Sequence, residues 1–231
     1  MAVLRGSRST SAVSTIATLL PETDGPYRLL ALGAHADDIE IGAGGTLLRL
    51  LSERPGLRVD VAVLTGDEVR HREAQESARA LIQGRFGEIG IRLIDLRDGY
   101  LPMSGARSKE EVERLKGGGP YHLVVCPSLG DAHQDHRHVA ELAWQTFRST
   151  TILEYEIPKY EGIGEKANLY VELTREQCER KVIHLMDSFP SQIDHSWFTA
   201  ETFWALLRLR GVESSSPTGY AEAFICRKLR I

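Results

Sequence analysis

The stretch "YRLLALGAHADDIEIGAGG", residues 27–45, indicates how this chain folds. Its first eight residues are mostly apolar, which is typical of a strand buried within a sheet. Three ionisable side chains, His35, Asp37 and Asp38, follow directly, and a helix is expected to begin just after them. The glycines of "GAGG" (42–45) lack the spacing of a nucleotide-binding loop, so they favour tight packing of this helix against the sheet.

Strands and helices are expected to alternate along the rest of the chain. Strands are predicted at 57–66, 91–96, 121–126 and 151–157, and helices at 68–84 with Gly84 as C-cap, 108–118 with Ser108 as N-cap, and 136–149. Beyond Pro158 we expect a strand and a helix over 167–189 with Thr174 as N-cap, a helix over 196–211 and a strand over 219–229. This order predicts an α/β fold: a Rossmann-like, mostly parallel sheet with helices on both faces and a small C-terminal lobe at about 159–231.

Length and composition restrict the class of protein. The 231 residues suffice for one α/β domain, expected over 27–231, preceded by a Ser- and Thr-rich N-terminal extension over 1–26. The net charge of -4, without a basic block, argues against nucleic acid as a partner. No apolar run reaches the roughly 18 residues of a membrane span. Three scattered cysteines suit a reducing compartment, so a cytoplasmic location is expected.

A second ionisable cluster lies about 100 residues after the first. In "CPSLGDAHQDHRHVAEL" (126–142), His133, Asp135 and His136 again follow a predicted strand. Because the carboxyl ends of parallel strands meet at one edge of a sheet, we expect the two clusters to converge there. Imidazole and carboxylate groups that converge in this way are the ligands of a divalent metal site with a position left open for water.

Each cluster also has a structural interpretation. A histidine at a strand end is often a hydrogen-bonded core residue, and Asp38 could cap the helix that follows it. Asp131 or Asp135 could likewise cap the helix that begins near 136. The HxDD pattern at 35–38 is therefore a weak signal alone, but the HxDH pattern at 133–136 on a second strand favours metal binding.

Several segments match the motifs of one family, in that family's order. They are "AHADDIEIGAGGT" (34–46), "RHREAQESARALI" (70–82, with Arg70 and Glu73), "LRDGYL" (96–101, with Asp98 and Gly99), "DAHQDH" (131–136), "ERKVIHLMDSFPSQ" (179–192, with Ser191 and Gln192) and "GYAEAF" (219–224). The chain thus resembles the PIG-L/LmbE-like zinc-dependent de-N-acetylases, whose two main motifs are written AHPDD and HxDH. The resemblance covers residues 28–228. Ala36 replaces the proline of the first motif, which removes some loop rigidity but no ligand.

This resemblance implies a role for each of eight residues. The zinc ligands would be His35, Asp38 and His136; the general base would be Asp37; His133 would polarise the carbonyl and act as an acid, with Asp135 orienting it; and Arg70 and Asp98 would bind sugar hydroxyls. Spacing alone equally allows Arg70 to pair with Glu73 on one helix face. The family's helix lysine is displaced here, so Lys181 receives no role. His71, His122, His184 and His195 are expected to be structural.

The implied activity is hydrolysis. We expect a zinc-dependent enzyme that uses metal-activated water to remove an N-acetyl group from an acetamido sugar or an N-acetylglucosaminyl-type glycoside. The same ligands accept Fe²⁺, Co²⁺ or Mn²⁺. Two alternatives stay open: a zinc amidase that acts on an aminoglycoside-type intermediate or an N-acyl amino acid, and a non-catalytic sugar-binding module. The presence of Asp37, a base that would not bind the metal, argues against the non-catalytic module. Trp197, Phe198 and Trp204 could form a homo-oligomer interface, although core packing explains them equally well.

Overall fold

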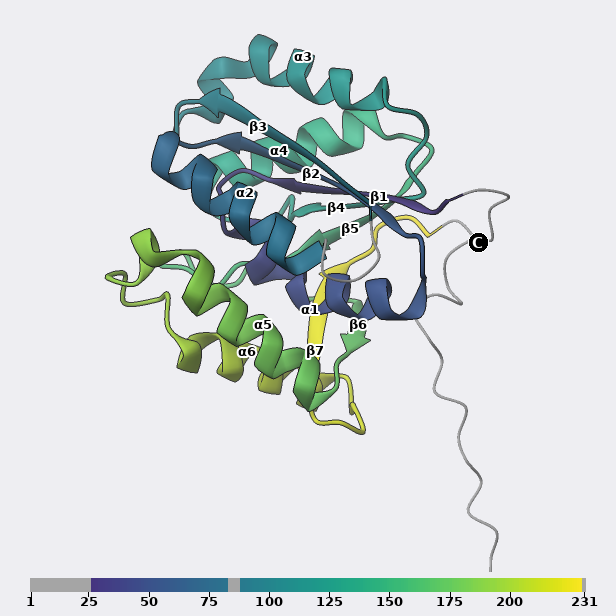
Figure 1. Cartoon of the computed structure of the whole chain (residues 1–231), viewed down its shortest axis with the longest axis vertical. Coiled ribbons are helices and arrows are strands. Elements are labelled where there is room, and N and C mark those ends of the chain that lie inside the picture. The colour runs from purple at the N-terminus through teal and green to yellow at the C-terminus, as the bar shows by residue number, and fades with distance from the viewer. Residues whose placement is uncertain (1–25, 83–87, 230–231) are drawn as a thin grey trace, which may run out of the picture.

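A single mixed sheet organises the molecule (Figure 1). The computed structural model describes residues 26–82 and 88–229. Within these ranges the strands lie in the order β3-β2-β1-β4-β5-β7-β6. Their bounds are β1 Arg28–Gly33, β2 Arg58–Thr65, β3 Glu88–Leu96, β4 Leu123–Pro127, β5 Thr151–Tyr155, β6 Leu169–Glu172 and β7 Ala221–Ile225. The first five pair in parallel, as the alternation of strands and helices predicts.

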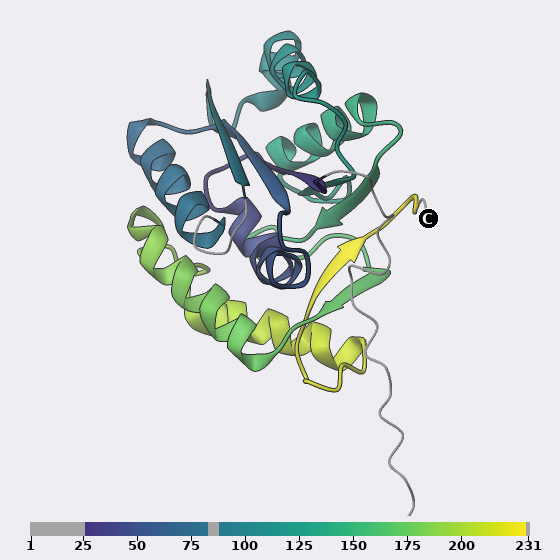
Figure 2. The same ribbon diagram turned by 45° about the vertical axis from the view of Figure 1, so that its right-hand side comes forward.

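Helices cover both faces of this sheet, which confirms the expected fold class (Figure 2). Their bounds are α1 Asp38–Glu53, α2 Glu68–Ile82, α3 Gly105–Lys116, α4 Gln134–Thr146, α5 Arg175–Ser188 and α6 Ala200–Glu213, with short 3-10 turns η3 Leu101–Ser104 and η4 Pro190–Gln192. Alternate residues of β1 enter two separate cores. Leu29 packs in the core beneath α1 and α2, and Leu30 packs in the core beneath α3 and α4. β1 is therefore buried on both faces.

The C-terminal region continues the sheet. Strand β7 pairs antiparallel with β5, and β6 pairs antiparallel with β7. Helices α5 and α6 lie on the far side of α1 from the sheet (Figure 2). The predicted N-cap Thr174 is confirmed, because it forms a capping box with Gln177 at the start of α5. Phe198 is fully buried, and Trp197 and Trp204 pack against the core, so core packing accounts for these aromatic residues. A homo-oligomer stays a prediction.

Two glycines of α1 set how closely that helix approaches its neighbours. A Cβ atom at Gly42 would overlap the ring of Tyr155, and one at Gly45 would overlap Leu173. The hydroxyl of Tyr155 also donates to the carbonyl of Leu32 at 2.6 Å. These contacts confirm the tight packing expected of "GAGG". They also hold the start of α1 against the carboxyl end of β1.

The predicted start of α3 is wrong. The helix begins at Gly105, directly after the η3 turn, so Ser108 lies inside its first turn and does not cap it. The Ser108 hydroxyl donates instead to the carbonyl of Gly105 at 3.1 Å. Glycine is a poor helix former, and the sequence pattern therefore hid the first turn. The predicted C-cap Gly84 and residues 1–25 of the expected extension lie outside the described residues. Within the described ranges, no helix combines the length and hydropathy needed to cross a membrane.

Candidate active site

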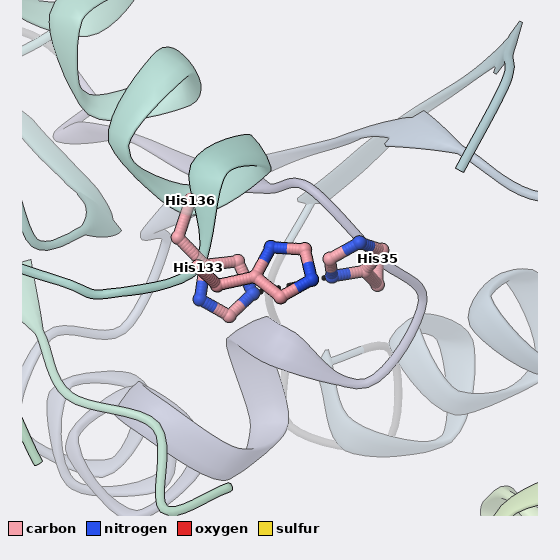
Figure 3. Close-up of side chains that lie close together, drawn as sticks. All are labelled: His35, His133 and His136. Carbon is pink, nitrogen blue, oxygen red and sulfur yellow. Dashed lines mark hydrogen bonds between the residues drawn. The ribbon is translucent and has the colours of Figure 1, made fainter. Parts of the chain in front are cut away.

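The two ionisable clusters meet at the carboxyl edge of the sheet. His35 and Asp37 lie in the loop after β1, and Asp38 begins α1. His133 ends the loop after β4, and Asp135 and His136 lie in the first turn of α4. Strands β1 and β4 are neighbours, and the chain leaves them toward opposite faces, so the loops flank the point where the strand order reverses. The rings of three histidines converge there (Figure 3), with ligating nitrogen atoms within 4.8 Å of one another.

The three predicted metal ligands, His35, Asp38 and His136, form a small buried triangle. The Nδ1 atom of His35 lies 3.2 Å from Nε2 of His136. The two Asp38 oxygens complete the triangle, with Oδ2 lying 3.3 Å from His35 Nδ1 and Oδ1 lying 3.3 Å from His136 Nε2. Ligands bound to zinc at about 2.0–2.1 Å in a tetrahedron stand roughly 3.3–3.4 Å apart. The size and donor set of this triangle therefore fit a divalent metal, which His35, Asp38 and His136 could hold.

The Asp38 carboxyl of the triangle favours its ionised form. Burial alone would raise the pKa of the Asp38 carboxyl, but His136, Lys159 and His35 outweigh it and hold the pKa well below its usual value. Asp38 Oδ2 accepts hydrogen bonds from the backbone amides of Ala34 and His35 at 2.9 and 2.8 Å. Its carboxylate thus points back toward the strand, and it does not cap α1. An ionised carboxylate held in this way is ready to bind a metal.

Asp131 orients His136, a role that the sequence did not reveal. Its Oδ2 atom lies 2.8 Å from Nδ1 of His136, and its Oδ1 accepts from the backbone amide of His133 at 2.8 Å. With Nδ1 facing this carboxylate, His136 presents Nε2 to the triangle. Sequence analysis considered Asp131 only as a possible helix cap. Its place five residues before His136 was the available signal.

Asp37 lies beside the triangle but belongs to another network. Its side chain is almost fully buried, and Oδ1 accepts from Nη2 of Arg70 at 2.7 Å. The other oxygen, Oδ2, has no hydrogen-bond partner among the described residues. Arg70 also donates through Nη1 to Glu73 at 2.8 Å and to Ser191 at 3.0 Å. The helix pair with Glu73 is therefore present, and the same guanidinium reaches the site. Binding of sugar hydroxyls by Arg70 stays a prediction.

Asp135, which is expected to orient His133, contacts that ring through its backbone and not through its carboxylate. That carboxylate accepts from the backbone amides of Gly99 and Leu101 at 2.7 and 3.1 Å. Only the backbone amide of Asp135 contacts the His133 ring, donating to Nδ1 at 3.3 Å. The reason is geometric, since Asp135 lies in the first turn of α4 and its carboxylate is directed at the turn that follows β3.

The ring of His133 is held in a neutral state. Burial lowers its pKa, and the neighbouring positive charges of His136, His35 and Lys159 lower it further. Because Nδ1 accepts the amide hydrogen of Asp135, the remaining ring proton resides on Nε2. His133 can therefore donate a hydrogen bond from Nε2 without first being protonated.

A polar cleft of about 230 Å³ opens above these residues. It is lined by His35, Ala36, Asp37, Thr65, Gly66, Arg70, Asp98, His133, Lys159, Gln192 and His195. The predicted substrate residues Arg70 and Asp98 are both on its wall. Asp98 Oδ1 lies 3.0 Å from Nε2 of His35, and the interaction with this imidazole lowers the pKa of the Asp98 carboxyl.

Among the residues of the cleft wall to which the sequence assigned no site role are Lys159, Gln192 and His195. His195, which is expected to be structural, has an exposed ring that lines the cleft and stacks on Trp197. Lys159 lies shortly after the end of β5, at the same edge of the sheet. This position was the available signal that Lys159 belongs to the site. Lys181, which received no role, is buried and structural, since its ammonium donates to Ile41 O and Glu222 Oε1 at 2.6 Å each.

Comparisons with known proteins agree with this geometry. The family model described as GlcNAc-PI de-N-acetylase, PIG-L, matches residues 30–147, slightly more than half of the chain. An uncharacterised deacetylase of Escherichia coli K12, YaiS, is 30% identical in a 141-residue alignment that covers 56% of this chain and 74% of that protein.

Two solved structures show how widely the fold is shared. N,N'-diacetylchitobiose deacetylase from Pyrococcus horikoshii has a TM-score of 0.64 at 23% identity, over 86% of this chain and 83% of that one. The 4-carboxy-2-hydroxymuconate hydratase GalB from Pseudomonas putida KT2440 has a TM-score of 0.70 at 16% identity, over 89% and 98%. Since the second catalyses hydration, likeness of fold alone does not fix the reaction. The family match and the E. coli relative indicate the reaction. This chain belongs to the PIG-L family and is a hydrolytic N-deacetylase.

Proposed function

We propose that this enzyme is a zinc-dependent hydrolase that removes the N-acetyl group from an acetamido sugar or an N-acetylglucosaminyl-type glycoside. One observation carries the proposal: the triangle of His35, Asp38 and His136 lies beside the unpaired oxygen of Asp37 at the base of a polar cleft. The family description, a GlcNAc-PI de-N-acetylase, supports an acetamido sugar as the substrate. Likeness to the chitobiose deacetylase is consistent with this choice.

The metal would be held by His35 Nδ1, Asp38 and His136 Nε2. When bound, a divalent cation supplies Lewis acidity and lowers the pKa of water toward neutrality. Zinc suits two imidazoles and a carboxylate, and Fe²⁺, Co²⁺ or Mn²⁺ accept the same donors. Asp131 would support this set by fixing the ring orientation of His136.

Asp37 would act as the general base. Its Oδ1 is occupied by Arg70, which leaves Oδ2 free to take the proton of the attacking water. The water oxygen then bonds to the acetamide carbon while the carbonyl electron pair moves to oxygen. When the carbon–nitrogen bond breaks, Asp37 returns the proton to the leaving amine nitrogen. Arg70 would keep this carboxylate ionised and pointed at the water.

His133 would stabilise the developing negative charge on the carbonyl oxygen. The lowered pKa of His133 favours the neutral ring. In that state Nε2 would donate a hydrogen bond to the carbonyl oxygen and so lower the barrier. One donor of this kind is worth roughly 3 kcal/mol in an enclosed site. Asp98 and Arg70 line the cleft on either side of this point, where they would bind hydroxyl groups of the sugar.

An amine-release assay on the purified, zinc-loaded protein tests the proposal. The panel would contain N-acetylglucosamine, alkyl and inositol-type N-acetylglucosaminides, diacetylchitobiose and several N-acetyl amino acids. We expect turnover of at least one glycoside and little release from the amino acids. Turnover of the amino acids alone would support the alternative amidase. Absence of release from every amide, with zinc present at one per chain, would contradict the proposed function.

A further inference from the structure

Lys159 places a buried positive charge in the wall of the cleft. It follows β5 at the carboxyl edge of the sheet, and its side chain is only 14% exposed. The Nζ atom lies 3.4 Å from Oδ1 of Asp38 and 5.1 Å from the ring centroid of Trp197. Neither the sequence motifs nor the mechanism above gives this residue a function.

The second cation of the cleft, Arg70, differs in having three short hydrogen bonds to protein side chains. Arg70 contacts Asp37, Glu73 and Ser191 at 2.7 to 3.0 Å. Lys159 has one long contact, to Asp38, among the described residues. An ammonium carries three donors, so most of its hydrogen-bonding capacity is unused. A metal at Asp38 would also compete for the oxygen that Lys159 contacts.

We propose that Lys159 is an anion-binding residue of the cleft that contacts the acyl oxygens of the substrate, an inference that builds on the deacetylase function proposed above. Addition of the water oxygen to the acyl carbon moves the carbonyl pair onto oxygen, and the ammonium stabilises that charge. After the carbon–nitrogen bond breaks, the same group holds the carboxylate of the released acetate. In this partly desolvated position, a charged hydrogen bond is stronger than at the surface.

Acetate and acetamide provide a matched pair of probes. They have nearly the same shape, but only acetate is charged. Binding of each to the zinc-loaded full chain would be measured by NMR titration of its methyl signal, with ionic strength held constant by chloride. The variants are Lys159→Met, Lys159→Gln and Lys159→Arg. Lys228→Met is the control, because Lys228 also lies over a tryptophan, 5.7 Å from the ring centroid of Trp144, but away from the cleft.

We expect Lys159→Met and Lys159→Gln to weaken acetate binding by roughly 10- to 100-fold and to leave acetamide binding within about twofold. Lys159→Arg should retain most of the acetate affinity, and Lys228→Met should match the wild type. Unchanged acetate binding in Lys159→Met, or equal loss of both probes with zinc retained, would overturn the proposal. Because binding is measured without turnover, the result stands whether or not the amide panel identifies a substrate.

Discussion

Neighbouring residues of one type have different environments in this site. Asp38 accepts two backbone hydrogen bonds and faces both metal-site imidazoles, whereas Asp37 pairs with a guanidinium. The chain turns into α1 between them, and the two carboxylates have different partners. The role of each carboxylate depends on its hydrogen-bond partner. A substitution can remove that partner while the carboxylate stays in place.

Arg70 offers such a test. In Arg70→Met, Asp37 loses its guanidinium partner, and we expect kcat to fall by roughly 10- to 100-fold, the value of one charge-assisted hydrogen bond. Zinc content should not change, because Arg70 contacts none of the proposed ligands. The control is Arg72→Met on the same helix, whose exposed side chain pairs only with Glu68. Steady-state kinetics of an identified substrate provide the measurement, and equal kcat values for the two variants would refute the positioning role.

Glu40 predicts a pH dependence of stability. Burial raises the pKa of this carboxyl to about 7, although the Ser77 hydroxyl donates to Oε1 at 2.5 Å. Between its ordinary value of 4.5 and about 7, the folded protein keeps a proton that the unfolded chain releases. The free energy of unfolding should therefore fall as pH rises through this window and level off above it.

The variant Glu40→Gln removes this titration. In metal-free protein its free energy of unfolding should decline less between pH 5 and 7.5 than that of the wild type, by roughly 2–3 kcal/mol. Urea unfolding at several pH values measures the difference. The amide can change the free energy of unfolding by the same amount at every pH. The prediction concerns only how that free energy changes with pH. Parallel pH profiles for the two proteins would be evidence against it.

At the scale of elements, one buried ion pair joins α1, α5 and β7. Lys181 Nζ lies 2.6 Å from Glu222 Oε1, and both side chains are about 4% exposed or less. The Glu222 carboxylate also accepts from the amides of Gly45 and Thr46 in the middle of α1, at 2.8 and 2.7 Å. This network holds the C-terminal part of the sheet and α5 against the helix whose first turn carries the site.

Removing one partner of this pair should be costly. Glu222→Gln leaves the Lys181 charge buried without a carboxylate, and we expect a loss of about 3–5 kcal/mol in the free energy of unfolding. The control Glu213→Gln removes a more exposed partner of Arg210 and should cost about 1 kcal/mol or less. Chemical denaturation of both variants decides the matter, and similar losses would show that the buried pair has no special weight.

For the whole molecule, metal binding should be visible as stability. Zinc at about 1,000 times its dissociation constant adds roughly 4 kcal/mol, which is about 8 °C or more in Tm for a chain of this size. The shift should vanish in His136→Asn and persist in His138→Asn. His138 is on the same helix but bonds Ser108, away from the triangle. A shift that survives in His136→Asn would place the metal elsewhere.

Much of this molecule could be predicted from its sequence. The parallel half of the sheet follows from apolar strands that alternate with polar helices, and the motifs at 35–38 and 133–136 follow neighbouring strands, so their convergence was predictable. The antiparallel placement of β6 and β7 was not, because it depends on tertiary pairing. The direction of the Asp135 carboxylate depends on the turn at Gly99. Lys159 is a single cation in a loop, without a local pattern to mark it.

The most direct test of the account compares the two adjacent aspartates. We predict that Asp37→Asn keeps about one zinc per chain by atomic absorption and loses turnover by at least roughly 100-fold, the scale of a general base. Asp38→Asn should lose zinc itself. Measuring bound zinc and amine release on the same two preparations separates the proton carrier from the ligand. Retained turnover in zinc-loaded Asp37→Asn, or full zinc occupancy in Asp38→Asn, would contradict the assignment on which the proposed function rests.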